Sequence, residues 1–210
     1  MPTAPLLAIW LFLFAQLAQA EPHLRMATLE YPPYSSEHLP DGGSIVELTR
    51  HRSYQGALAL WPKEVKEEGL HPSRPLFYSE LGLFIRNGYP LQFSALRELR
   101  GQTLGIVRGY GYPQHILDAG LPLEKAVDDI SNLRKLNARR FNLVLLERIV
   151  GNHLIVNDAQ LRGQLSWHDH VLERIPLLVG FVPPKAGEPD WSAVFEQGLR
   201  DLHSSGEYMQ

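Results

Sequence analysis

A glycine-rich stretch, Arg108-Gly109-Tyr110-Gly111-Tyr112, is the first of several groups in this 210-residue chain whose types and spacing could do chemistry. It lies between an expected strand and an expected helix. Backbone N–H groups at such a turn can point into a cleft, and the start of a helix adds partial positive charge, so the stretch could bind an anion such as a carboxylate. It could equally be a plain tight turn. It is not a phosphate-binding P-loop, because no Gly-Lys-Ser/Thr follows.

Two lysines follow Trp61-Pro62 at the end of another expected strand. Lys63 and Lys66 are three residues apart and would therefore share one face of a helix. A cation there could pair with an anionic ligand. The glutamates beside them favour a different interpretation, a solvated turn whose charges face water.

A carboxylate and two tyrosines complete the candidate binding residues. Glu147 ends a strand expected over residues 142–146, where it could hold a cationic group or serve as the acid at the start of the next helix. Tyr31 and Tyr34 flank two prolines and could form flat walls for a ligand, or simply pack at a strand end. If these residues share one site with Lys66 and the glycine turn, a zwitterionic or anionic solute suits it best.

His168-Asp169-His170 is a possible metal site, since residues two apart share one face of a strand. No third ligand can be assigned, so we interpret the stretch as a surface loop. The sequence has no Gly-x-Ser-x-Gly elbow either, which leaves a Ser-His-Asp hydrolase unsupported. We therefore expect no metal and no cofactor.

The composition removes several other classes of protein. Lys and Arg total 20 against 23 Asp and Glu, a net charge of −3, so there is no basic excess to bind a nucleic acid backbone. The chain has no Cys. That excludes thiol catalysis, Cys-ligated zinc, iron–sulfur clusters and a disulfide framework.

The first 20 residues have the pattern of an export signal. Residues Leu6 to Leu17 are almost purely apolar, too short a run to cross a bilayer as a helix. The small-x-small sequence Ala18-Gln19-Ala20 follows, which predicts cleavage after Ala20. The n-region has no Lys or Arg, and an uncleaved anchor is the alternative. We expect a bacterial periplasmic protein.

Short apolar runs alternate with amphipathic ones, which predicts an α/β fold with mostly parallel sheets. We expect strands near residues 24–29, 57–61, 81–85, 102–107, 126–127, 142–146 and 177–182. Helices are expected from the capping box at Ser44, from near Pro113, around Leu133 and Leu136, and at the C-terminal end.

Two candidate linkers divide the mature chain into two lobes. Residues 86–90 interrupt the pattern after the third strand, and the stretch around residues 173–178 could carry the chain back. Lobe 1 would then comprise residues 21–88 and 177–210, and lobe 2 residues 89–176. A chain that crosses twice leaves a cleft between its lobes, where ligands commonly bind.

With these features in place, the chain resembles the periplasmic solute-binding proteins of family 3, which deliver amino acids and similar solutes to ABC transporters. The similarity consists of short runs whose order and spacing match along nearly the whole mature chain: Leu24 to Tyr34, Tyr54 to Ala57, Ser73 to Phe77, Leu99 to Val107, Arg140 to Glu147 and Phe195 to Leu202.

The resemblance implies a type II periplasmic-binding-protein fold that closes on its ligand, and it implies roles for single residues. Tyr31 matches the aromatic that stacks on the ligand. Lys66 falls where amino-acid binders carry an Arg for the α-carboxylate, whose other partners match Tyr110 and Gly111. Glu147 matches the acid that takes the α-amino group.

Three departures from the family pattern bear on binding. Lys66 is a point charge rather than a bidentate guanidinium. Trp61 stands where a small hydroxyl residue is usual and would narrow the pocket. Near residues 50–54 the chain lacks about 25 to 30 residues, which implies that lobe 1 has lost an edge strand and a helix. Weakened ligand binding would follow.

The resemblance implies a monomer without enzymatic activity that binds a small solute and contacts an inner-membrane permease or a sensor. Two alternatives stay open. A periplasmic dehydratase could use the same cleft, with Glu147 as its general acid. A sensing or protein-contact module could also exist without any transported solute.

Overall fold

The computed structural model describes residues 23–27 and 54–206. Three predictions fall on residues outside this part. They are the helix starting at Ser44, the candidate residues Tyr31 and Tyr34, and, apart from residue 54, the deletion near residues 50–54. The strands described are β1 (Met26–Ala27), β2 (Gly56–Leu60), β3 (His71–Pro72), β4 (Phe77–Arg86), β5 (Leu104–Val107), β6 (Leu123–Ala126), β7 (Leu143–Glu147) and β8 (Leu165–Phe181).

Helices lie between most of these strands, as the α/β prediction requires. They are α3 (Pro62–Glu67), the 3-10 turn η1 (Leu96–Leu99), α4 (Gln114–Leu117), α5 (Asp129–Asn137), α6 (Arg148–Asn157) and α7 (Trp191–Ser205). The expected helices at Leu133 and at the C-terminal end are α5 and α7. The helix expected near Pro113 is a single turn.

The strands form one path in the order β1-β2-β8-β4-β7-β5-β6, with β3 paired to β8. The parallel pairs are β1 with β2 and β5 with both β6 and β7. The long strands β4 and β8 add antiparallel pairs to each other and to β7 and β2. The α/β class is therefore confirmed, with parallel strands at both ends of the path and antiparallel strands between them.

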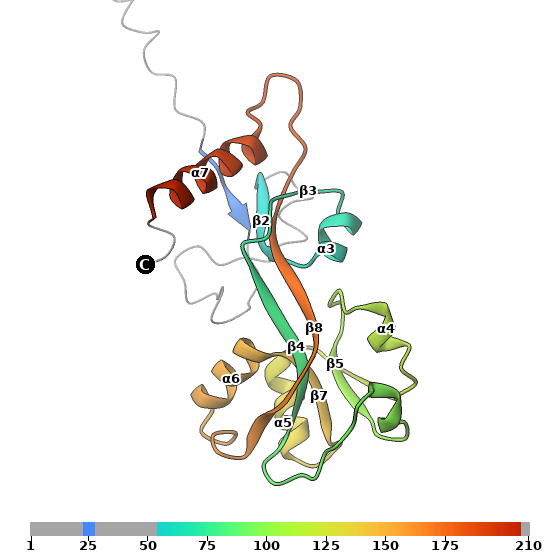
Figure 1. Ribbon diagram of the computed structural model, residues 1–210. Helices are drawn as coiled ribbons and strands as arrows, with labels where there is room; N and C mark the ends of the chain where they lie inside the picture. Colours follow the sequence, from blue (N-terminus) through green and yellow to red (C-terminus); the bar gives the residue numbers. More distant parts are fainter. Residues whose placement is uncertain (1–22, 28–53, 207–210) are drawn as a thin grey trace, which may run out of the picture.

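The two long strands run between an upper and a lower group of elements (Figure 1). The upper lobe contains β1, β2, β3, α3 and α7, and the lower lobe contains β5, β6, β7, α4, α5 and α6. The end of β8 pairs with β2 at residues 178–181, while its remainder pairs with β4. The chain thus passes twice between the lobes. The residue boundaries at 88/89 and 176/177 remain a prediction.

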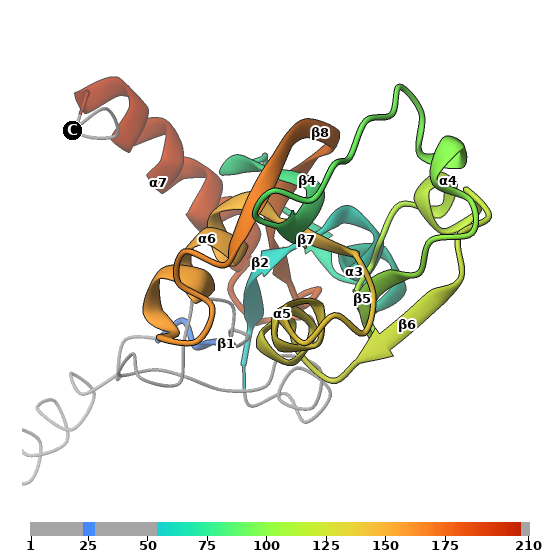
Figure 2. The same cartoon turned by 90° about the horizontal axis from the view of Figure 1, so that it is seen from below.

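Alternation along the central strands builds two cores on opposite faces of the lower lobe. On β4, Leu83 and Ile85 pack with α4, while Phe84 between them packs with residues of α5 and α6. On β7, Leu145 packs in the same core as Leu83, and Leu146 packs in the same core as Phe84. Successive side chains of a strand point to opposite faces, so a fully apolar strand must be covered on both. Seen from below, α5 and α6 lie together and α4 lies apart from them beyond β5 (Figure 2).

One interpretation of the stretch before the C-terminal helix is wrong. The sequence His168-Asp169-His170 is not a surface loop, because it belongs to the 17-residue strand β8. Residues 173–178, the second candidate linker, lie in the same strand, where its pairing changes from β4 to β2. Only the apolar half of β8 was expected. Its polar half is a strand because β4 supplies the hydrogen-bonding partner, with Phe84 opposite Trp167.

Candidate functional site

The upper lobe contributes Trp61, which stands between β2 and α3. A bulge precedes it, where the register of β2 against β8 shifts and Ala59 has a φ of 58°. The Trp61 ring is 4% exposed and meets two rings of the lower lobe edge-on. Its centroid lies 6.2 Å from that of Tyr110 and 5.8 Å from that of Tyr112. Trp61 is thus a contact between the lobes.

Glu64, which the sequence analysis placed only among solvated glutamates, lies at the same junction. Its Oε2 accepts a hydrogen bond from the backbone N–H of Trp61 at 2.9 Å, which caps α3. Its Oε1 accepts one from the N–H of Gly111 in the lower lobe at 3.4 Å. Burial raises the pKa of this carboxyl, and the two backbone hydrogen bonds oppose that rise.

Glycine at position 111 permits this approach. A Cβ there would lie 3.2 Å from Cγ of Glu64 and 3.5 Å from Cβ of Lys63. Those distances leave no room for a side chain unless α3 yields slightly. The N–H that the sequence analysis assigned to an anionic ligand therefore faces a carboxylate of the protein itself.

The tyrosines of the turn are anchored in the lower lobe. The Tyr110 hydroxyl donates to Oδ2 of Asp129 at 2.8 Å, and the Tyr112 hydroxyl accepts from the N–H of Val107 at 3.1 Å. Burial is the main reason that the pKa of both tyrosines is raised. Burial also raises the pKa of Asp129 to about 7, and the carboxylates of Asp128 and Glu147 raise it further against the hydrogen bond from Tyr110.

Glu147 ends β7 and is 1% exposed. Its Oε2 accepts from the N–H of Val150 at 2.7 Å, so it caps α6. The interpretation as the acid at a helix start is therefore confirmed. Its carboxylate is one of the two that raise the pKa of Asp129, the hydrogen-bond partner of Tyr110. A role of Glu147 in ligand binding stays a prediction.

Lys66 is exposed on α3, and its role in ligand binding stays a prediction. Lys63, one turn earlier, lines a cavity of about 370 Å³ that opens beside Trp61 and Gly111. The other lining residues come from the start of α3, the turn before α4 and the middle of β8: Pro62, Tyr112, Pro113, Gln114, Glu173, Arg174, Ile175 and Pro176. The cavity therefore has walls from both lobes and from a crossing strand.

The three described charged residues that line this cavity have partners of their own. Oε2 of Glu173 lies 3.3 Å from Nε2 of His115, and Arg174 donates to Oε1 of Glu80 at 2.6 Å. Nζ of Lys63 lies 4.0 Å from Oε1 of Glu67. Of the predicted residues, Trp61 contacts Tyr110 and lines the cavity together with Gly111, whereas Glu147 is buried and Lys66 is exposed.

The histidines of β8 pack against an aromatic ring. The Phe93 ring lies 5.3 Å from that of His168 and 4.8 Å from that of His170, and Nε2 of His168 is 3.2 Å from the carbonyl oxygen of Leu91. In the described part of the chain, no group of three or more His, Cys, Asp or Glu residues could hold a metal ion. Within the same residues, no helix is long and apolar enough to span a membrane.

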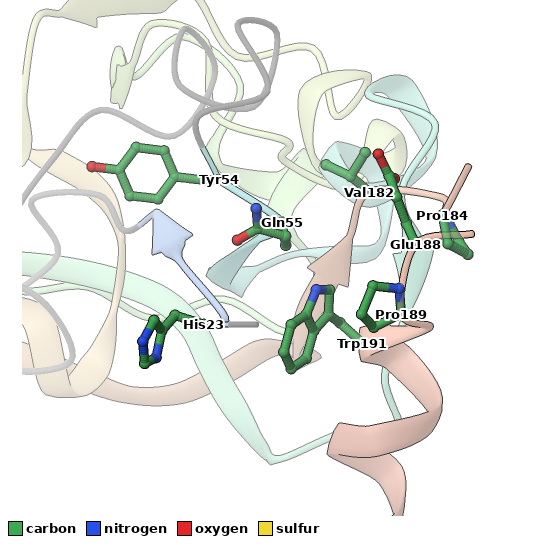
Figure 3. A pocket seen from close by; sticks show the side chains of 8 residues that line it. All are labelled: His23, Tyr54, Gln55, Val182, Pro184, Glu188, Pro189 and Trp191. Atoms are coloured by element: carbon green, nitrogen blue, oxygen red, sulfur yellow. The ribbon is translucent and has the colours of Figure 1, made fainter. Parts of the chain in front are cut away.

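A second cavity, of about 240 Å³, lies in the upper lobe near the start of α7, and Figure 3 shows its lining side chains. Its lining contains none of the predicted site residues that the structure describes. It is formed by His23, Tyr54, Gln55, Val182, Pro184, Glu188, Pro189 and Trp191. The cavity between the lobes is therefore the candidate functional site.

Comparison with known proteins gives a match in structure but not in sequence. No protein-family model and no curated protein matches the chain. The GluR0 ligand-binding core from Nostoc punctiforme in complex with L-glutamate aligns with a TM-score of 0.70 at 15% identity, over 89% of this chain and 96% of that one. A mutant of ArgBP from T. maritima gives 0.71 at 12% identity, over 88% and 91%.

A histidine kinase sensor domain with similarity to periplasmic binding proteins aligns equally well, with a TM-score of 0.70 at 16% identity over 89% of this chain and 92% of that one. These identities are low, so the likeness concerns the fold. The chain therefore has the two-lobed α/β fold of the type II periplasmic binding proteins, as the resemblance to solute-binding family 3 implied.

Proposed function

We propose that this protein is a periplasmic solute-binding protein that captures a small polar solute between its lobes and presents the closed form to an inner-membrane ABC permease or a sensor. One observation carries the proposal. The cavity beside Trp61 is walled by α3 of the upper lobe, the turn before α4 of the lower lobe and the crossing strand β8. A solute held by all three would favour the closed arrangement by its differential affinity.

The neighbours in structure support a binding role. Those compared above are a glutamate-bound ligand-binding core, a mutant of ArgBP and the sensor domain of a histidine kinase. A sensor domain among them is the reason to keep both kinds of membrane partner in the proposal. The capping role of Glu147 accounts for its burial without invoking acid catalysis.

The proposal can be tested with the mature chain, residues 21–210. Thermal shift and calorimetry against amino acids, polyamines and small carboxylates should identify a solute that raises Tm. At 100 times Kd, binding adds about 2.7 kcal/mol to the free energy of unfolding. The variant Trp61→Phe should weaken the binding of that solute at least several-fold, because the smaller Phe ring loses part of the contact with Tyr110 and Tyr112.

Gly198→Ala is a suitable control, since nothing lies within 4 Å of a Cβ at that position. If no compound of the panel raises Tm or gives heat at millimolar concentration, the proposal fails. A submicromolar Kd would uphold it and would contradict the weakened binding expected from the deletion near residues 50–54.

A further inference from the structure

We propose that Glu64 determines the charge of the solute, and that the cleft selects a cationic amine without a carboxylate at the Gly109–Gly111 turn, such as a diamine or polyamine. This inference rests on the proposed function and narrows its solute class. It departs from the interpretation of the sequence, in which Lys66 and the turn together favoured an anion.

The position of the Glu64 carboxylate is the first reason. Oε1 of Glu64 already accepts the hydrogen bond that the Gly111 N–H can donate, at 3.4 Å. A solute carboxylate at this N–H would have to displace Oε1 and would then lie against a like charge in a partly buried place. Such a juxtaposition is costly, and it discriminates against the wrong ligand.

The charges around the turn are the second reason. Among the described residues, two cations line the cavity, Lys63 and Arg174. The Lys63 side chain is 45% exposed and lies 4.0 Å from Glu67, and Arg174 is bonded to Glu80. Both cations therefore already lie beside a carboxylate of the protein.

The aromatic rings are the third reason. Trp61 meets Tyr110 and Tyr112 edge-on at the junction, and Trp61 and Tyr112 also line the cavity of about 370 Å³. Aromatic faces attract ammonium groups. A volume in this range also suits a small solute. The Glu64 carboxylate is bonded to the N–H groups of two lining residues, Trp61 and Gly111, so an amine beside them would have a charge partner as well as an apolar wall.

The test compares two solutes of equal length and opposite charge. Calorimetry on the mature chain is done with putrescine, with succinate and with the neutral 1,4-butanediol. We expect putrescine to bind with measurable heat, and the Kd of succinate to be at least 10-fold higher than that of putrescine. Glu64→Gln keeps an acceptor for the α3 cap but removes the charge, and should raise the Kd of putrescine at least 10-fold. Asp201→Asn, which removes an exposed carboxylate on α7 of the same lobe, should change the Kd of putrescine less than 2-fold.

The wild type gives an independent readout if a variant folds poorly. Raising NaCl from 20 to 200 mM should weaken putrescine binding several-fold, because the interaction is between opposite charges. Tighter binding of succinate or butanediol than of putrescine, or an unchanged Kd in Glu64→Gln, overturns the inference. If only an amino acid of the wider panel binds, the inference fails and the proposed function stands. If nothing binds, both fail.

Discussion

At the scale of single residues, the acids Glu64 and Asp129 form hydrogen bonds at the junction between the lobes. The lysines that the sequence analysis singled out, Lys63 and Lys66, are exposed. Asp129 is 7% exposed. Its Oδ2 is bonded to Tyr110, while Oδ1 has no hydrogen-bond partner within the described part of the chain. Burying a carboxyl in this way disfavours its charged form. The cost of ionising Asp129 should therefore appear as a dependence of stability on pH.

The expected dependence has a definite sign. The pKa of Asp129 is raised from 3.8 to about 7 in the folded chain. Between these values the folded state holds a proton that the unfolded state releases, so the free energy of unfolding decreases as pH rises through this window. Between pH 4 and 8, Asp129 should lower the free energy of unfolding of the wild type by an amount on the order of 2 to 4 kcal/mol. Asp129→Asn should lack this decrease, which chemical denaturation at each pH measures.

The burial of Glu64 contributes a decrease of the same sign, so only the difference between wild type and variant isolates Asp129. Asp169→Asn serves as the control, because Asp169 is exposed on β8. Parallel pH profiles for the wild type and Asp129→Asn would show that Asp129 does not carry this proton.

At the scale of elements, glycines decide how closely a helix can approach its neighbours. Gly151 of α6 lies against the Phe84 ring of β4, where a Cβ would come within 2.3 Å of Cζ. Gly198 of α7 has nothing within 4 Å of the same position. Both are glycines in helix interiors, so helix propensity alone predicts the same gain from alanine at each.

Packing should reverse that gain at one of the two sites. Gly151→Ala should lower the free energy of unfolding by about 1 to 3 kcal/mol, because the fully buried ring of Phe84 cannot move aside without strain. Gly198→Ala should raise it by about 0.5 to 1 kcal/mol. Urea denaturation measures both. Equal effects of the two substitutions would mean that α6 does not pack on β4 through Gly151.

At the scale of the whole molecule, β4 and β8 are the two long strands that run between the lobes. Glu80 of β4 ties them to the lower lobe, since it accepts hydrogen bonds from Arg174 of β8 and Arg148 of α6. The two arginines also lower the pKa of this carboxyl. The contacts of Trp61 and Glu64 with the turn at Gly111 then bring the lobes together. Separation of the lobes would break those contacts while the strands stay paired.

The absence of Cys from the chain makes this motion measurable. Spin labels on the double variant Glu67→Cys and Lys125→Cys report the distance between exposed positions of α3 and β6. We expect two distance populations without solute and mainly the shorter one at saturation. Labels at Lys125 and Asn152, both in the lower lobe, should give one unchanged distance. A single unchanged distance for the first pair would contradict closure.

Much of the fold was predictable because its signal is local. The apolar runs of β2, β4, β5 and β7 and the periodic positions of α5 and α7 were read from the sequence within a few residues. The extent of helix α6 and the polar half of β8 were not, since α6 has no clear apolar stripe and β8 is a strand only because β4 pairs with it. Trp61, Tyr110 and Gly111 were candidates from the sequence and lie at the junction between the lobes, but their role in binding stays a prediction. Glu64 and Asp129, which bond at the same junction, were not among the candidates.

The sequence by itself determined that this is an α/β protein without thiol chemistry, and that a glycine turn follows the strand ending at Val107, because strand and turn preferences act between near neighbours. The tertiary structure alone decided which charged side chain of α3 meets that turn. Lys66 and Glu64 are two residues apart, so they point in different directions on a helix. The packing of α3 against the lower lobe turned the carboxylate, and not the lysine, toward Gly111.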